Sequence, residues 1–333
     1  MAKLVEKRSE ILFIYDVTDA NPNGDPVEEN KPRIDEETGH NIVTDVRLKR
    51  TVRDWLHDYK DKEIFVREIR DENGFLQDAK MRAEDFLLDK DGKKINKDSL
   101  KTVQEMEQIV YDNVIKHCID VRLFGATIPV ELKKGKKTYG GSVTLTGPVQ
   151  FKLGRSLHRV EMTYIKGTGA FASQPGKEQF TFREEYILPY SLIAFSGILN
   201  ENTAAATKLT EEDLNFLMEG LWRGTKGLIS RSKVGQMPRL LLQVIYKEKD
   251  YHIGELDRRI KLISTKRDEE IRDVSDLKID VTDLAKALEA NKGRIEKVRY
   301  LKDDRLVLTK NEQPLEKVED LAQGITFEQF KFS

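Results

Sequence analysis

"EILFIYDV", from Glu10 to Val17, is the stretch that decides the fold. Its apolar residues run almost without interruption and include β-branched and aromatic side chains, a pattern typical of a buried strand. The residues that follow, Thr18 to Asn41, are rich in Pro, Gly, Asn and Asp and therefore predict a loop. We expect a fold built around this strand, which leaves the core through a long turn-rich connection.

The next segment, "VTDVRLKRTVRDWLHDY", predicts a helix from Val43 to Tyr59. Thr44 is its expected N-cap. Lys49, Arg50 and Arg53 fall together on the flank of the apolar stripe, because side chains three or four positions apart share a helix face. The stripe itself has helical spacing and consists of Leu48, Val52, Trp55, Leu56 and Tyr59.

The same patterns predict the remaining elements. Residues 60–118 are highly charged and mostly helical, with a turn at "DKDGKK", and residues 153–182 form an extended excursion or long hairpin. A helix opens at Thr210, where Asp213 completes a pattern close to a capping box. Another helix is expected near Val281 to Ala290. The further strands are Gly141–Phe151, Tyr186–Leu199 and Arg239–Tyr246.

The core elements follow the order strand, helix, strand, excursion, strand, helix, strand. This is the β-α-β-β-α-β order of ferredoxin-like folds and RNA-recognition modules, so we expect an α+β fold with a palm of that type. The first and third strands should then be central. Arg239–Tyr246 is more apolar than an edge strand requires, so another element should cover it.

Composition limits the class of protein. The chain has 333 residues, of which 35% are charged, and its mean hydropathy is −0.56. No apolar run approaches membrane-spanning length, and "MAKLVEKRSE" has no apolar signal core. Cys118 is the single cysteine, and with five His it provides neither an internal disulfide nor a zinc spacing. We expect a cytoplasmic protein without a membrane segment, bound metal or cofactor.

The charge is unevenly distributed although the net charge is −1. Val130 to Arg183 contains ten Lys/Arg against three Glu and no Asp, and Arg223 to Arg239 contains five Lys/Arg and no acid. The remainder is net acidic, so the chain has the composition for one basic face and one acidic face. The alternative is that these are ordinary solvated loops.

The segment "RGTKGLISRSKVGQ" combines glycines with Lys226, Arg231 and Lys233. It lacks the G-x-x-x-x-G-K-[ST] pattern, so a nucleotide-hydrolysing P-loop is unsupported. Flexible backbone and cations instead suit a phosphodiester backbone, which requires charge neutralisation. The alternative is a surface loop between a helix and a strand.

The excursion mixes basic and aromatic residues. Such a mixture suits single-stranded nucleic acid, because bases stack on rings while cations pair with phosphates. The alternative is a mobile loop with incidental charge. The residues concerned are Arg155, His158, Arg159, Lys166, Phe171, Lys177 and Phe180.

"DANPNGDP", Asp19 to Pro26, matches the first half of an EF-hand calcium loop. The match fails at position 12, which is Asn30 where a bidentate Glu is required, and a strand precedes the loop where an EF-hand needs a helix. A looser divalent-ion site using Asp16, Asp19 or Asp25 stays open. No G-x-S-x-G nucleophile motif is present, and a buried structural role is expected for Cys118.

Four motifs taken in order resemble a known family: "DVTDANPNGDP", "NIVTDVRLKRTVRDWL", "ILPYSLIAF" and "SKVGQMPRLLLQVIY". They are similar to the backbone subunit of type I CRISPR surveillance (Cascade) complexes, in the RAMP superfamily, most closely in its I-B form. The resemblance covers about residues 10–246. It implies a non-catalytic subunit whose copies polymerise head to tail along one guide RNA, beside other Cascade subunits. Each copy would hold the RNA backbone while target DNA pairs with the displayed bases.

The resemblance also assigns roles to residues. On the first helix, Lys49, Arg50 and Arg53 become candidate phosphate contacts, and the glycine-containing loop adds Arg231 and Lys233. The excursion matches a β-hairpin thumb that folds over and kinks the guide, which places Arg155, His158, Arg159, Phe171 and Phe180 on the thumb.

The implied domain plan has four parts. Residues 1–59 begin the palm, and 60–140 form an inserted, mostly helical subdomain. Residues 141–247 complete the palm and include the thumb at 153–182. Residues 248–333 form a C-terminal extension packing on the palm.

Two other functions stay open at this point. One is a metal-dependent endoribonuclease of the RAMP superfamily, since related type III backbone subunits cleave RNA with a loop aspartate; the candidates here are Asp16, Asp19, Asp25 and Asp45. Guide-processing RAMP endoribonucleases rely on a placed His and a glycine-rich C-terminal loop, and this chain has no clear G-x-G-x-x-G near its end. The other is a calcium-binding scaffold unrelated to RNA, centred on Asp19.

Overall fold

The computed structural model describes residues 3–172 and 180–332, and the side chains of residues 168–183 lie outside that description. The fold is mixed α+β, and the chain divides into two compact units. Four elements have residues in both units: α1 (Asp45–Lys60), β7 (Val149–Phe151), β10 (Phe180–Leu199) and η2 (Gly220–Gly224). The first unit comprises Met1–Lys7, Val52–Gln150 and Ile198–Gly220, and the second comprises Arg8–Thr51, Phe151–Gly197 and Leu221–Ser333.

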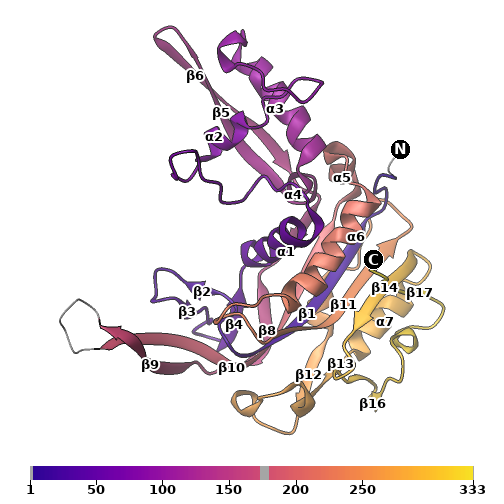
Figure 1. The fold of residues 1–333 in the computed structure, drawn as a ribbon. Helices are drawn as coiled ribbons and strands as arrows, with labels where there is room; N and C mark the ends of the chain where they lie inside the picture. The colour runs from indigo at the N-terminus through magenta and orange to yellow at the C-terminus, as the bar shows by residue number, and fades with distance from the viewer. Residues whose placement is uncertain (1–2, 173–179, 333) are drawn as a thin grey trace. The chain divides into compact units, whose positions relative to one another are not determined.

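A large sheet forms the base of the second unit, with β17, β14, β11, β1, β10, β8 and β4 as neighbours in that order (Figure 1). β1 is buried from its start through Val17, which confirms the predicted buried strand. β14 pairs with β11 on the side away from β1, so the apolar strand is covered, as expected. The other bounds are β1 (Ser9–Ala20), β4 (His40–Val43), β8 (Gly154–Arg159), β11 (Gln236–Tyr246), β14 (Ile295–Lys302) and β17 (Phe327–Gln329).

Smaller elements complete the second unit. β9 pairs with the start of β10 as a hairpin that projects from the sheet (Figure 1). β2 and β3 pair with each other, and β12, β13, β15 and β16 form a small second sheet. The bounds are β2 (Gly24–Asp25), β3 (Lys31–Pro32), β9 (Thr163–Ala172), β12 (Lys261–Ser264), β13 (Leu277–Asp280), α7 (Thr282–Ala290), β15 (Leu308–Lys310) and β16 (Gln313–Pro314). Short 3-10 turns are η3 (Leu256–Arg259), η4 (Asp268–Glu270), η5 (Val274–Asp276) and η6 (Val318–Leu321), and η2 (Gly220–Gly224) is a π-helical turn at the boundary.

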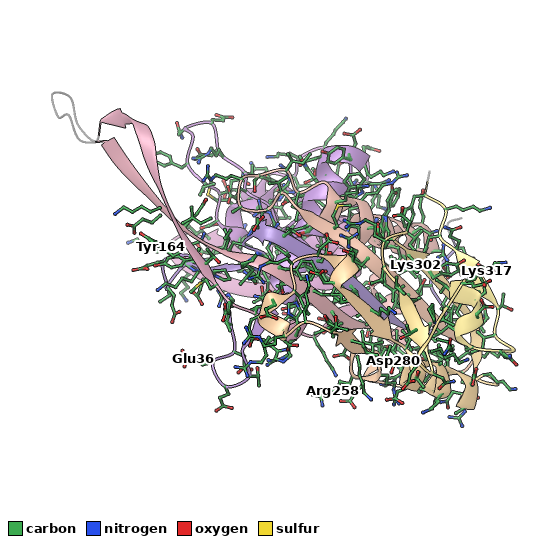
Figure 2. The ribbon with its side chains drawn as sticks, turned by 90° about the horizontal axis from the view of Figure 1, so that it is seen from below. Glu36, Tyr164, Arg258, Asp280, Lys302 and Lys317 are labelled. Atoms are coloured by element: carbon green, nitrogen blue, oxygen red, sulfur yellow. The ribbon has the colours of Figure 1, made fainter. Side chains whose placement is uncertain are left out.

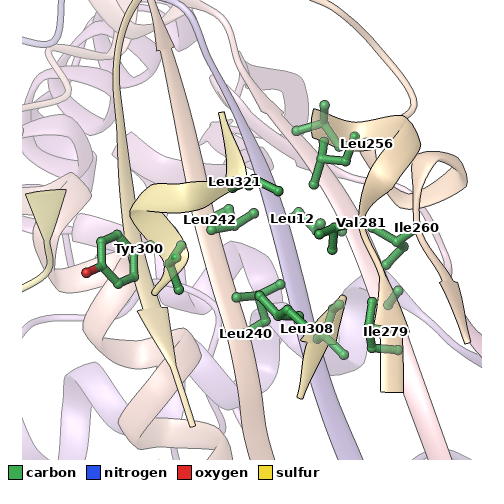
Figure 3. Close-up of a cluster of buried hydrophobic side chains, with 14 of the residues drawn as sticks. Leu12, Leu240, Leu242, Leu256, Ile260, Ile279, Val281, Tyr300, Leu308 and Leu321 are labelled. Carbon is green, nitrogen blue, oxygen red and sulfur yellow. The ribbon is translucent and has the colours of Figure 1, made fainter. Parts of the chain in front are cut away.

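The main core of the second unit lies between the large sheet and the C-terminal elements. Leu12 of β1 and Leu242 of β11 face each other in register and pack with Ile279 and Leu308 (Figure 3). Burying each such aliphatic side chain contributes about 1.5–3 kcal/mol. The residues after 248 therefore share their core with the first strand of the chain.

The first unit contains a β-hairpin packed on a helix. Met106 and Val110 of α3 share a buried cluster with Ile128 and Val130 of β5. β5 and β6 join through a two-residue turn in which Gly135 has a φ of +60°, a backbone conformation natural to glycine. The bounds are α2 (Ala79–Glu84), η1 (Lys97–Ser99), α3 (Val103–His117), α4 (Ile119–Phe124), β5 (Gly125–Lys134), β6 (Lys137–Thr146), α5 (Glu201–Thr207) and α6 (Glu211–Glu219).

The predicted single strand Gly141–Phe151 is wrong. β6 begins earlier, at Lys137, and ends at Thr146, and the separate strand β7 begins at Val149. Pro148 lacks the N–H that a continuous strand would use. A Cβ placed on Gly147 would lie 2.0 Å from the carbonyl carbon of Phe124, so the chain passes Phe124 too closely for any other residue.

Candidate nucleic-acid interface

The loop that leaves β1 organises its neighbours through asparagine side chains. Asn23 Oδ1 accepts hydrogen bonds from the Thr44 amide (2.8 Å) and the Thr44 hydroxyl (2.9 Å). Thr44 Oγ1 in turn accepts the amide of Arg47, so Thr44 is the N-cap of α1, as predicted. Asn21 Nδ2 donates to the Asn30 carbonyl at 2.6 Å. The stretch that resembles a calcium loop therefore holds the start of α1 in place.

Two of the three aspartates proposed as metal ligands, Asp16 and Asp25, are bound to cations. Asp16 is buried between Arg239, 2.8 Å away, and the Tyr190 hydroxyl. Asp25 pairs with Arg33 at 2.6 Å. Among residues 3–172 and 180–332, no group of three or more His, Cys, Asp or Glu side chains could hold a metal ion. These carboxylates serve as acceptors that fix the turns and the sheet.

The three residues of α1 predicted as phosphate contacts have different surroundings. Lys49 is half-buried and pairs with Asp45 at 2.9 Å, and Arg50 is exposed. Arg53 is buried in the first unit, where its Nε donates to Asp120 Oδ2 at 3.0 Å. The side chains of Lys49 and Arg53 are only 12% and 11% exposed, so helical spacing grouped one exposed cation, Arg50, with two that are largely covered.

Asp120 is the reason that Arg53 is buried. Its carboxylate has no exposed surface and also accepts the amides of Phe65 (2.8 Å) and Val66 (3.1 Å). The Arg53 guanidinium lies 5.3 Å from the ring centroid of Phe124. This buried pair fixes the loop after α1 to α4.

The arginines of β8 reach solvent. Arg155 pairs with Asp35 at 2.8 Å and Arg159 lies 3.6 Å from Glu269, both with more than half of the side chain exposed. Weak exposed pairs of this kind contribute about 0–1 kcal/mol and can exchange their carboxylate for another anion. Both arginines are therefore available for phosphate.

His158 is a structural residue. It is buried, its ring stacks on Tyr190, and its Nε2 accepts the Leu192 amide at 3.3 Å. Burial lowers the pKa of His158, with backbone contacts to Arg159 and Asp268 acting in the opposite direction. The side chains of Phe171 and Phe180, the other two residues placed on the thumb, lie outside the described side chains.

The basic loop before β11 is partly buried at Lys233 and exposed at Arg231 and Lys226. Lys233 Nζ donates to the carbonyl of Asn21, and burial together with the Arg47 charge lowers the pKa of Lys233 to about 8. Arg231 binds Glu185 of β10 through two hydrogen bonds of 2.7 and 3.1 Å but remains largely exposed, as does Lys226. Hydrogen bonds thus tie this loop to the exit of β1 and to the base of the hairpin.

The residues that sequence reasoning missed lie beside those it found. Arg47 is on the first turn of α1, close enough to Lys233 to lower its pKa. Tyr164 and Tyr186 face each other across β9 and β10. Helical spacing signalled Arg47, but the tyrosines become a pair only when the hairpin register is known.

Five of the exposed Lys and Arg residues of the second unit lie on α1, β8 and the basic loop. We call them the exposed cations: Arg50, Arg155, Arg159, Lys226 and Arg231. None of the helices in the described ranges is long and apolar enough to cross a membrane.

The fold defines the class of protein first. Over 98% of this chain and 96% of the other, it matches a chain in a solved structure described as "CRISPR RNA-guided surveillance complex, pre-nicking", with a TM-score of 0.50 and 13% identity. A second structure, described as "CRISPR RNA-guided surveillance complex", has a TM-score of 0.48 and 12% identity over 98% of this chain and 95% of that chain. The first likeness places the fold among the chains of such assemblies.

Sequence comparison then identifies the family. The model described as "CRISPR-associated protein Cas7" matches residues 7–282. CRISPR-associated protein Cas7 of Haloferax volcanii is 34% identical over 313 residues, which cover 90% of this chain and 88% of that protein. The chain belongs to the Cas7 family, so the resemblance inferred from its motifs is confirmed at the level of the family, and the I-B form stays a prediction.

Proposed function

We propose that this Cas7-family chain is a non-catalytic subunit that binds the phosphate backbone of a CRISPR guide RNA and presents its bases to target DNA. Family membership supports the proposal. The position of the exposed cations also supports it. A protein that binds the RNA backbone, and leaves sequence recognition to base pairing between guide and target, gains most of its affinity from phosphate contacts.

The observation that carries the proposal is a set of bonds between segments distant in sequence. The loop after β1 binds Thr44 at the start of α1 and Lys233 in the basic loop. Arg231 of the same basic loop binds Glu185 at the base of the hairpin. The basic loop and the start of α1, both of which carry cations, are thereby tied to the loop that leaves β1, which is an arrangement that suits an extended polyanion.

The finer features follow from the family resemblance. In this proposal β1, α1, β10 and β11 belong to a ferredoxin-like palm, and 153–182 is a thumb over the guide. Residues 1–59 and 141–247 make the palm, 60–140 are inserted, and 248–333 pack on it. Copies bind head to tail on one guide, with other Cascade subunits, in a type I-B complex of the cytoplasm.

Salt dependence of RNA binding tests the proposal. We would compare the wild-type chain with a triple variant, Arg50→Ala, Lys226→Ala and Arg231→Ala, on single-stranded RNA over a salt series. Each lost phosphate contact should reduce the slope of log affinity against log salt by about 0.7, so three should reduce it by roughly 2.

A matched control removes three exposed lysines of the first unit, Lys90, Lys93 and Lys101, and therefore the same net charge. The control should keep the wild-type slope. Equal slopes for the two triple variants would contradict the assignment of the exposed cations, and a wild-type chain that does not bind RNA would contradict the proposed function. Cleavage of the RNA in the presence of divalent ions would contradict its non-catalytic part.

A further inference from the structure

Two tyrosines form a ring pair at the base of the hairpin. Tyr164 of β9 lies directly opposite Tyr186 of β10, and their ring centroids are 5.2 Å apart at an interplanar angle of 46°. Tyr164 is 46% exposed although it is aromatic and lies on a well-formed strand. Figure 2 labels Tyr164 near the base of the projecting hairpin.

The Tyr186 ring is held in place by its hydroxyl and by a neighbouring cation. The hydroxyl donates to Glu29 Oε2 at 3.2 Å. Lys31 Nζ lies 5.0 Å from the ring centroid of Tyr186 and 3.3 Å from Glu29. A ring fixed in this way has already lost rotamer freedom, so a planar ligand would bind with a smaller entropic penalty.

Cations that can exchange partners flank the rings. Lys166, two residues beyond Tyr164 on the same face of β9, lies 3.9 Å from Glu184, and Lys31, beside the Tyr186 ring, pairs with Glu29. These pairs are exposed, so each contributes at most about 1 kcal/mol and a phosphate can replace the carboxylate. A flat aromatic face between such cations has the chemistry that binds one nucleotide of a single strand.

A purely structural explanation has to be weighed. A cross-strand aromatic pair stabilises a hairpin by about 0.2–1 kcal/mol whether or not a ligand is present. The buried rings of Tyr15 and Phe195, 6.2 Å apart inside the same unit, illustrate that role. Tyr164 differs because much of its surface faces solvent.

We propose that the Tyr164–Tyr186 pair is a stacking platform for one base of the bound single-stranded RNA. The inference rests on the proposed function. It adds one contact to a site that is otherwise assigned to phosphates. The contact is to a base, and it does not depend on which base is present, because every base offers an aromatic face.

The experiment compares two RNAs of equal length and charge, one with normal bases and one with abasic sugars. The full-length chain is used as wild type, Tyr164→Phe and Tyr164→Leu; Leu keeps an apolar side chain on the strand but cannot stack. Tyr164→Leu should weaken binding of the normal RNA roughly five- to hundredfold and leave abasic binding unchanged. Tyr164→Phe should bind both RNAs as wild type does.

Tyr139→Leu is the control, since Tyr139 is equally exposed on β6 of the first unit. It should bind both RNAs as wild type does. If Tyr164→Leu weakens both RNAs equally, or neither, the platform is excluded while the proposed function stands. If the wild-type chain binds neither RNA, the proposed function fails and the platform fails with it.

Discussion

Arg53 and Arg231 each place a guanidinium against one carboxylate, but the two pairs have opposite surroundings. The side chains of Arg53 and Asp120 are 11% and 0% exposed, whereas those of Arg231 and Glu185 are 58% and 22% exposed. A buried pair resists loss of one partner because the other charge stays desolvated, and an exposed pair readily exchanges its partner. The comparison separates an arginine that is buried within the fold from one that faces solvent.

The largest effect is expected for Arg53→Ala. Asp120 would remain buried without its cation, so the free energy of unfolding should fall by about 3–5 kcal/mol. Urea unfolding of the full chain measures it. Arg231→Ala is the counterpart and should lose no more than about 1 kcal/mol. Similar losses for the two variants would show that burial does not distinguish these pairs.

Lys233 is half-buried and should show an intermediate effect that depends on pH. Its pKa is lowered to about 8 by burial and then by Arg47, whereas a lysine of the unfolded chain titrates near about 10.4. Between these values the unfolded state binds more protons, so Lys233 makes stability rise with pH across that window. Below the folded pKa, Lys233 is protonated in both the folded and the unfolded state, so the full cost of burying its charge is present and this gain in stability is lost.

Urea unfolding of wild type and Lys233→Met, at pH values on either side of about 8, checks this. The variant has no charge to titrate, so the difference in stability should shift in favour of wild type as pH rises. A difference independent of pH would mean that Lys233 is solvated like an ordinary surface lysine.

The smallest effect is expected for Glu185→Gln, which releases Arg231 from its carboxylate. If Arg231 faces RNA phosphate, RNA affinity should increase by up to roughly fivefold, with stability changed by less than about 1 kcal/mol. Glu131→Gln is the control, because Glu131 pairs with Lys80 at 2.6 Å in the first unit. A weaker affinity for Glu185→Gln would mean that the pair positions Arg231 and does not compete with RNA.

Sequence patterns predicted element types well where one face or a whole strand is apolar. β1, α1, β10 and β11 lie where the patterns indicated, and α7 spans Thr282–Ala290 against an expected Val281–Ala290. The capping box of Thr210 and Asp213 is present at the start of α6. These features depend on residues close in sequence, so local spacing is enough to find them.

Other features depend on contacts that local spacing does not contain. The break between β6 and β7 follows from the approach of Gly147 to Phe124, which lies 23 residues earlier in the chain. The burial of His158 depends on Tyr190 and Leu192 of a different strand. A list of basic residues therefore contains both solvent-facing and buried side chains.

The sequence by itself determined the element order, the apolar strands and, through its ordered motifs, membership of the Cas7 family, because these reside in residue types and their spacing. Only the tertiary structure decided which cations face solvent. Arg53 lies three residues after Arg50 on one helix, but Asp120, 67 residues further along the chain, buries one and leaves the other exposed. The reason is that desolvation is set by all the neighbours of a charge, and most of them come from elsewhere in the chain.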